Sequence, residues 1–526
     1  MITRMTITGL IRVCAVLPVI MVATLGWAQT PVIQCAPPAV CVTTWHYDNG
    51  RTGANPNEKI LTAANVNPRQ FGKLFTQPVD GAVIGQTLYL PAVQIPGNGA
   101  HNAVYVATMH DSVYAFDADT ATGTNASPLW HTSFLTSATT TVPVAMQGCG
   151  GTTQWSEVGI VSTPVIDPVA GTLYVVAKTH ENSAFVHRLH ALDVTTGLEK
   201  PGSPIVITAS YEFAGKDNIF EDAMQVNRPA LLLQKGILYI AFGSNGCRGD
   251  KEEGWVVAYN ASTLQPKGAF DDEPGESAAA VWMRGGGLSA DSTGNIYGAT
   301  ADGPFMAGTN FGQSVFKLKQ VGNTLQLADW FTPFNERQLD LNDLDMSEPV
   351  LVLPNQTGKY PHLLAAVGKQ GTIYILNRDN MGHFCSTCTV TDTQIVGELP
   401  AFARETGALV YWNNAIYSSG DGLPISALSL TKGLLTPAPF AQSKKVTSGH
   451  SPVISANGNT AGILWQLNGS NLSAFNATTM LKLYSCGQAP NGRDLLPALP
   501  HFANLMVANG KVYVGTNNSL VVYGLL

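Results

Sequence analysis

The stretch His101–Asp119, HNAVYVATMHDSVYAFDAD, contains two short apolar strands separated by a polar turn. Valine, tyrosine and alanine fill both strands, as is typical of buried β-structure. A similar stretch, LYVVAKTH followed by FVHRLHALD, ends at Asp193. Because the same order of strands recurs within one chain, the sequence indicates an internal repeat rather than a set of unrelated strands.

The repeated unit occurs eight times, at irregular spacings of about 45 to 75 residues. Two apolar strands precede the last common strand of each unit. That last strand begins at Ser112, Arg188, Trp255, Ser314, Thr372, Pro424, Asn471 and Ser519. Units that repeat one strand order in this way are typical of β-propellers, in which each unit forms one blade. The sequence therefore predicts an all-β, eight-bladed β-propeller of four-stranded blades.

The chain ends directly after the third strand of the eighth unit, so that unit lacks a fourth strand. The segment Phe71–Val79, FGKLFTQPV, precedes the first unit and resembles the missing strand. Pairing the two would close the ring and remove an exposed sheet edge. We therefore expect an N-terminal strand to complete the last blade.

Composition and the first residues bear on the class of protein and its location. Of the 526 residues only 12% are charged, and the net charge is −7, which argues against a nucleic-acid partner that needs clustered Lys and Arg. Arg4 and Arg12 accompany the apolar run Val13–Leu25, and small residues at Gly26 and Ala28 resemble a cleavage site. No other stretch is long and apolar enough to span a membrane.

From these features we expect a signal peptide over residues 1–28 that is cleaved near Ala28, an N-terminal extension over 29–70 and the propeller over 71–526. The expected location is the periplasm or the exterior of the cell, if the source is bacterial.

The cysteines fit an exported protein, in which disulfides persist. Cys35 and Cys41 bracket a Pro-rich loop and are expected to pair. Cys385 and Cys388 are spaced as a disulfide, half of a metal site or a redox pair, and the lack of a second pair favours the disulfide.

Two more cysteines, Cys149 and Cys247, are expected to bond to each other. Cys149 lies in the loop that enters the second blade and Cys247 lies in the inner loop of the third, so both should occupy the same face of neighbouring blades. Cys486 is then left over.

The opening TWHYDNGRTGANPNEKILTAANVNPRQFGKLF resembles that of quinoprotein alcohol dehydrogenases, and AFDADTATG…PLW resembles their tryptophan-docking repeat. The segment IYGATADGPF…SVFKLK is similar to the part of those enzymes around the cofactor. The whole chain looks closer still to exported propellers related to that family and described as PQQ-binding-like. The resemblance implies an eight-bladed propeller, with pyrroloquinoline quinone (PQQ) and calcium as possible cofactors.

Only some of the family's calcium-binding and catalytic residues have counterparts in this sequence. Where the resemblance places a calcium-binding Glu, this sequence has Arg248, and Glu252 or Glu253 could substitute only if the loop shifts. Asp302 stands at the family's Asn ligand and is an acceptable calcium donor. Gly308 stands at the catalytic Asp, so no catalytic base is identified. No Cys-x-x-Cys-His motif for attaching a haem is present.

Charged and aromatic residues gather in the loops of one face, which we call the open face. It comprises the loops between successive blades and the turns between the second and third strands of each blade. The candidate ligand-binding residues there are Trp155, Glu157, Asn227, Arg228, Arg248, Arg284, Asp302, Glu348, Lys369, Arg404 and His450. The acidic run Asp340–Glu348 lacks the Gly turn of an EF-hand and is interpreted as a polar loop.

Two hypotheses follow. The first is a scaffold that binds a small polar molecule or a protein at its open face. The second is a PQQ- and calcium-dependent dehydrogenase of alcohols or sugars. The missing base and the position of Arg248 favour the first.

Overall fold

A computed structural model describes residues 1, 33, 35, 39–147, 155–244, 253–275, 278–400, 407–446 and 450–526. The chain divides into two compact units, Met1–Pro31 and Val32–Leu526. Apart from Met1, the first unit lies outside the described residues, and so does the predicted signal peptide. Among the described residues, no helix combines the length and the hydropathy needed to cross a membrane.

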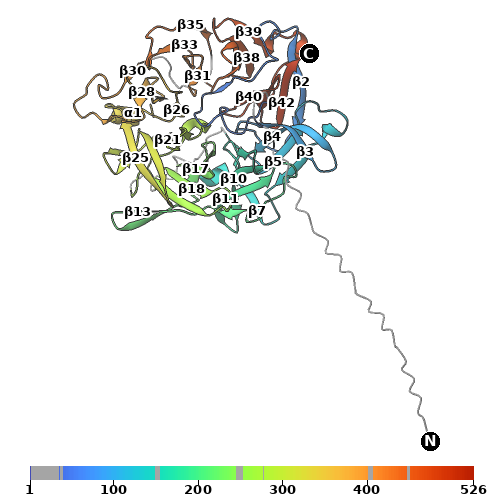
Figure 1. The fold of residues 1–526 in the computed structure, drawn as a ribbon, viewed down its shortest axis with the longest axis horizontal. Coiled ribbons are helices and arrows are strands. Elements are labelled where there is room, and N and C mark those ends of the chain that lie inside the picture. The colour runs from blue at the N-terminus through green and yellow to red at the C-terminus, as the bar shows by residue number, and fades with distance from the viewer. Residues whose placement is uncertain are drawn as a thin grey trace. The chain divides into compact units, whose positions relative to one another are not determined.

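Among the described residues of the second unit, eight sheets of four to six strands form the eight predicted blades (Figure 1). The four strands of each blade pair antiparallel with one another, and two further two-stranded sheets are separate hairpins. Each blade is given from its inner to its outer strand. Blade 1 contains β3 (Leu88–Ile95), β4 (Gly99–Thr108), β5 (Ser112–Asp117) and β6 (Trp130–Ser133). Blade 2 contains β9 (Val165–Asp167), β10 (Thr172–Glu181), β11 (Ala184–Asp193) and β12 (Ile205–Val206). Blade 3 contains β16 (Leu232–Gln234), β17 (Ile237–Ser244), β18 (Trp255–Asn260) and β19 (Pro266–Asp271). Blade 4 contains β20 (Ser289–Ala290), β21 (Ile296–Ala299), β24 (Val315–Val321) and β25 (Thr324–Thr332).

The second half of the ring repeats this order. Blade 5 contains β26 (Leu351–Val352), β27 (Leu363–Val367), β28 (Ile373–Asn377) and β30 (Gly397–Leu399). Blade 6 contains β31 (Val410–Trp412), β32 (Ala415–Ser418), β33 (Pro424–Thr431) and β35 (Ala441–Lys445). Blade 7 contains β36 (Val453–Asn457), β37 (Thr460–Asn468), β38 (Asn471–Asn476) and β39 (Lys482–Ser485). Blade 8 contains β40 (Leu505–Ala508), β41 (Lys511–Gly515), β42 (Ser519–Leu525) and β2 (Phe71–Pro78).

Short elements decorate the blades. They are β1 (Ala54–Asn55), β7 (Thr139–Pro143), β8 (Glu157–Val158), the hairpin β13–β14 (Ser210–Phe213 and Lys216–Ile219), β15 (Gln225–Val226), the hairpin β22–β23 (Phe305–Met306 and Asn310–Phe311), α1 (Glu336–Leu341), β29 (His383–Phe384) and β34 (Leu434–Leu435). Several of them lie in the loops of the open face, where they position the candidate site residues.

The predicted ring closure is confirmed. Strand β2 pairs antiparallel with β42, from Phe71 opposite Leu525 to Pro78 opposite Ser519, so the N-terminal strand supplies the fourth strand of blade 8. Figure 1 shows β2 in blue beside β42 in dark red. Because the C-terminal strand is paired on both sides, the last blade presents no unpaired edge there.

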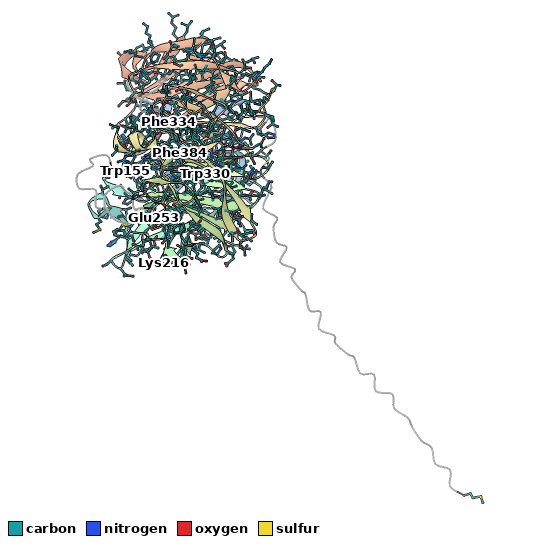
Figure 2. All side chains as sticks on the ribbon, turned by 90° about the vertical axis from the view of Figure 1, so that its left-hand side faces the viewer. Trp155, Lys216, Glu253, Trp330, Phe334 and Phe384 are labelled. Atoms are coloured by element: carbon teal, nitrogen blue, oxygen red, sulfur yellow. A yellow bond between two sulfur atoms is a disulfide. The ribbon has the colours of Figure 1, made fainter. Side chains whose placement is uncertain are left out.

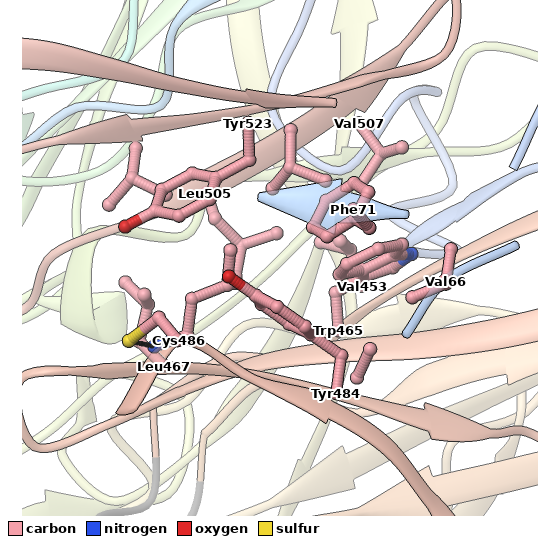
Figure 3. Close-up of a cluster of buried hydrophobic side chains, with 14 of the residues drawn as sticks. Val66, Phe71, Val453, Trp465, Leu467, Tyr484, Cys486, Leu505, Val507 and Tyr523 are labelled. Atoms are coloured by element: carbon pink, nitrogen blue, oxygen red, sulfur yellow. Dashed lines mark hydrogen bonds between the residues drawn. The ribbon is translucent and has the colours of Figure 1, made fainter. Parts of the chain in front are cut away.

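The hydrophobic core is divided among the contacts between blades. Eight large clusters of buried side chains each combine residues of two neighbouring blades. The cluster between blades 7 and 8 includes Phe71, whose ring meets Tyr484 edge-on at 4.9 Å and Trp465 at 5.3 Å (Figure 3). The closing strand is therefore anchored by packing as well as by its backbone ladder.

The segment that precedes β2 lies inside the ring. Backbone hydrogen bonds join Val42 to β3 and Asn49, Gly50, Thr52 and Gly53 to the inner strands of blades 4, 5, 6 and 7. Arg51 is fully buried among them and donates from Nε to Leu288 O at 2.9 Å and from Nη1 to Trp45 O at 2.8 Å. The N-terminal residues thus fill the centre of the propeller and form a floor beneath the open face.

The two local disulfides are formed as expected, Cys35 with Cys41 and Cys385 with Cys388. Cys486 is free and buried. The expected bond between Cys149 and Cys247 falls outside the described residues.

Candidate functional site

The open face holds a cavity of about 120 Å³ where loops of blades 4, 6, 7 and 8 meet. Its lining consists of Arg284, Gly407, Asp421, His450, Ser451, His501, Phe502, Ala503 and Asn504. Asn504 Oδ1 accepts a hydrogen bond from Trp45 Nε1 at 3.2 Å, which ties the cavity to the N-terminal floor. We call this the arginine–histidine cavity.

Two guanidinium groups flank one aromatic ring of this cavity. The Arg228 guanidinium carbon lies 4.8 Å from the Phe502 ring centre and that of Arg284 lies 5.4 Å from it. Arg228 is fully buried, and it donates to Val161 O and Arg284 O at 3.2 Å each. Among the described residues no carboxylate pairs with Arg228, whereas Arg284 Nε lies 3.4 Å from Glu348 Oε1. Arg228 therefore acts on the cavity through its charge, and Arg284 lines it directly.

The two histidines of the cavity both have lowered pKa values. Burial, then His501 and then Arg284 lower the pKa of His450 to about 4. Burial, followed by the charges of Arg284 and Arg228, lowers the pKa of His501. At both rings Asp421 opposes these effects less strongly than Arg284 promotes them. The imidazoles are thus neutral at pH 7, chiefly because they are buried, and the charge of Arg284 adds to this effect.

A second group of charges, the aspartate–lysine cluster, comprises Asp302, Asp343, Asp345 and Lys369. The three carboxylates offer oxygen atoms within 4.8 Å of one another, which is a spacing that a cation could bridge. The Lys369 ammonium already bonds Asp343 and lies 2.7 Å from Asp345 Oδ2. A metal ion at Asp343 and Asp345 would have to displace this ammonium, so the cluster as built is not a ready calcium site.

Asp302 is the member of this cluster without an ion pair among the described residues. Burial, then the charge of Asp345, raises the pKa of Asp302 to about 7, against the opposing charge of Lys369. A carboxyl group with such a pKa can accept and release a proton near neutral pH. Gly308, at the family's catalytic position, is an exposed residue in the turn between β22 and β23.

The short stretch from Asp345 to Glu348 touches both groups, since Asp345 binds Lys369 and Glu348 pairs with Arg284. The acidic run interpreted as a polar loop therefore supplies side chains to two charged clusters. The candidate residues predicted from the sequence do not include Asp343, Phe502 or Asn504. A signal for the last two was available, because they directly precede the inner strand β40.

The other candidates are placed as follows. Trp155 stacks on Trp282 with ring centres 6.4 Å apart. Glu157 accepts from Thr141 Oγ1 at 2.7 Å and lies 3.1 Å from His110 Nδ1. Asn227 is buried and donates to Ala241 O at 2.8 Å, a structural contact. Arg248 and Arg404 lie outside the described residues.

No protein-family model and no curated protein matches the sequence. Solved structures do match. The quinohemoprotein alcohol dehydrogenase of Comamonas testosteroni superposes with a TM-score of 0.61 at 14% identity, over 92% of this chain and 80% of that one. The quinohemoprotein alcohol dehydrogenase ADHIIG of Pseudomonas putida HK5 gives 0.61 at 12% identity, over 93% and 80%. A europium-containing methanol dehydrogenase gives 0.57 at 12% identity, over 93% and 98%.

These likenesses establish the fold. The chain is an eight-bladed β-propeller, and it shares this fold with the three dehydrogenases named above. At identities this low, they assign no activity to it.

Proposed function

We propose that the arginine–histidine cavity binds a small polar molecule that carries a carboxylate or a comparable acidic group. The observation that carries this proposal is the position of the two guanidinium groups: Arg284 lines the cavity, and the guanidinium carbons of Arg228 and Arg284 lie 4.8 Å and 5.4 Å from the ring centre of Phe502. Guanidinium groups bind planar acidic groups through paired hydrogen bonds, and Phe502 in the cavity lining offers apolar contact.

The size of the cavity supports a small ligand rather than a protein. A volume of about 120 Å³ is well below that of pockets for drug-sized molecules, which begin at roughly 300 Å³. The cavity therefore accommodates a small acid, or only the acidic end of a larger molecule.

Calorimetric titration with citrate, with glycerol as a neutral control, tests this proposal. We expect citrate to bind and glycerol not to. Arg284→Lys keeps a cation beside Glu348 but loses the planar fork, so it should weaken citrate binding roughly tenfold. Arg337→Lys changes an exposed arginine of α1 and should leave binding unaltered. Equal affinity in the wild type and in Arg284→Lys would contradict the proposal.

A second candidate function, quinone-dependent oxidation of alcohols or sugars, is supported by Asp302 and by the structural neighbours. PQQ, when bound, would supply the two-electron acceptor, and Arg284 is the residue placed to hold one of its carboxylates. Asp302 would take up the proton of the substrate hydroxyl. The fit is partial, because the cavity is small for the whole cofactor and Lys369 holds the carboxylates that calcium would need.

Incubation with PQQ and calcium, or with a lanthanide, followed by dye reduction with alcohols and sugars, tests this candidate. If it holds, Asp302→Asn should abolish turnover, whereas Asp379→Asn, at an exposed acid paired with His362, should not. No turnover with any of these metals, or turnover that survives Asp302→Asn, rules out the assigned role of Asp302.

We also propose that the protein is exported, on the strength of the charged and apolar pattern over residues 1–28. Mass spectrometry of the protein recovered from its native host should find an N-terminus near Gln29. An N-terminus that retains residues 1–28 would contradict this.

A further inference from the structure

A second cavity, of about 290 Å³, lies between the β13–β14 hairpin and blade 3. It is lined by Asp217, Asn218, Ile219, Glu221, Gln225, Glu253 and Gly275, and we call it the carboxylate cavity. Three of these residues are acidic and none is basic. Figure 2 shows Glu253 between Trp155 and Lys216 from top to bottom.

Two buried residues of this cavity, Gln225 and Glu253, carry hydrogen-bond acceptors that are not fully satisfied by donors of the described residues. Glu253 is only 9% exposed, and its carboxylate receives a hydrogen bond from the Gly275 amide at 3.3 Å. Gln225 is 1% exposed; its amide donates to Glu253 O at 2.9 Å, while its Oε1 has no hydrogen-bond partner among the described residues. Buried acceptors of this kind cost free energy unless a donor satisfies them.

More carboxyl groups lie behind the lining. Asp272 is fully buried, and its Oδ2 has no partner in the described part of the chain. Burial, followed by the charge of Asp271, raises the pKa of Asp272 well above its ordinary value. Burial, then Asp271 and, more weakly, Glu221 raise the pKa of Glu253 to about 7, while the Gly275 amide and the Trp255 indole act to lower it. Burial raises the pKa of Asp271 to about 6. No Lys or Arg of the described residues forms an ion pair with Asp217, Glu221 or Glu253, although the buried Lys178 ammonium donates to the backbone oxygen of Gln225 at 2.6 Å.

The spacing of the carboxylates distinguishes between kinds of cation. A bare metal ion needs several ligand atoms around one point. Among the described residues only Asp302, Asp343 and Asp345 converge closely enough, so the acids of this cavity do not. Separate carboxylates in a cavity of this size instead suit an organic molecule with two positive ends.

We propose that the carboxylate cavity binds a small organic diamine. One ammonium group donates to Gln225 Oε1 and the Glu253 carboxylate at the buried end, and the other lies against Asp217 and Glu221 at the exposed end. An ammonium group has three donors and no acceptor, which matches the unfilled acceptors. The site is separate from the arginine–histidine cavity and does not depend on the function proposed for it.

Calorimetric titration of the full chain with 1,4-diaminobutane tests the proposal. The comparison ligands are butylamine, 1,4-butanediol and calcium chloride. We expect the diamine to bind, the monoamine to bind roughly tenfold or more weakly, and the diol and calcium not to bind at this site. Binding should weaken as salt is added, because the exposed end is screened.

Two neutral variants and one control locate the site. Glu253→Gln and Glu221→Gln should each weaken diamine binding, the first roughly tenfold or more. Glu212→Gln removes the same charge from the exposed β13 strand outside the lining and should leave affinity unchanged. Because Glu221 is exposed, its variant keeps the test valid even if Glu253→Gln folds poorly. No diamine binding by the wild type, equal binding by all variants, or tighter binding of calcium than of the diamine would each overturn the proposal.

Discussion

At the scale of single residues, burial and the neighbouring charges decide what each candidate can do. Arg228 and Arg284 are close in space, yet Arg228 is buried against Phe502 whereas Arg284 lines the cavity. Asp302 and Asp343 are both aspartates of one cluster. Against the effect of burial, Lys369 holds the pKa of Asp343 below its ordinary value, while burial raises that of Asp302 to about 7. A residue type therefore says little about its role until its surroundings are known.

Asp302 should make stability depend on pH in a direction opposite to that of a paired carboxylate. Its pKa is raised in the folded state, so between about pH 4 and pH 7 the fold retains a proton that the unfolded chain has released. The stabilising effect of that proton is lost as the pH rises through about 7. We expect Asp302→Asn to gain melting temperature relative to the wild type as the pH is raised from 4.5 to 8.

Differential scanning fluorimetry across this pH range measures the effect. Asp379→Asn, at an exposed acid, should give a curve parallel to that of the wild type. A gap between Asp302→Asn and the wild type that does not grow with pH would show that Asp302 is ionised throughout.

At the scale of elements, two N-terminal pieces hold the ring together in different ways. Strand β2 completes blade 8 by pairing with β42. The segment before it bonds to inner strands around the ring and places Arg51 at the centre. Strand β2 closes the ring by completing the last blade, and the segment before it fills the centre of the ring.

Phe71→Ala should destabilise the protein by about 3–5 kcal/mol, because it removes a fully buried ring from the contact between blades 7 and 8. Leu74→Ala lies on the same strand at a more exposed position and should cost less than about 1 kcal/mol. Denaturant titration of both variants makes the comparison. Similar losses would mean that the packing of Phe71 adds little to closure.

Arg51→Lys should cost about 2 kcal/mol, since a lysine cannot reach both Leu288 O and Trp45 O from one side chain and would leave a buried carbonyl unpaired. The exposed Arg69 provides the control, and Arg69→Lys should be neutral within about 0.5 kcal/mol. Denaturant titration of Arg51→Lys without a loss of stability would indicate that the carbonyls find other donors.

At the scale of the whole molecule, shared cores link every blade to the next. Each large hydrophobic cluster combines two neighbouring blades, and closure by β2 makes that series of contacts continuous. No blade among the described residues has a core of its own. Because each blade packs against its neighbours, the loops of the open face keep fixed positions around the N-terminal segment even where they are far apart in sequence.

We therefore expect one cooperative unfolding transition rather than several. Scanning calorimetry should give a single endotherm, and Phe71→Ala and Trp255→Ala, in distant contacts between blades, should move that same endotherm downward. Two resolved transitions, with each variant moving only one of them, would show that parts of the ring unfold independently.

The sequence predicts the propeller, its eight blades and its closing strand because strand pattern is a local property that repeats. The predicted starts at Ser112, Trp255, Asn471 and Ser519 coincide with the starts of β5, β18, β38 and β42. The Cys35–Cys41 and Cys385–Cys388 bonds are likewise predictable, because cysteines so near in sequence stay close in space whatever the rest of the chain does.

The sites depend on the path of the loops around the ring, which no local pattern encodes. Asp302 meets Asp343 and Lys369 because two blades present their loops to the same place. Gln225 and Glu253 share a cavity because a hairpin inserted before blade 3 folds over it. The N-terminal residues fill the centre for the same reason, because their hydrogen bonds reach inner strands of blades that are far apart in sequence. The local sequence pattern thus specifies the propeller fold, and tertiary packing decides which loop side chains come together in its sites.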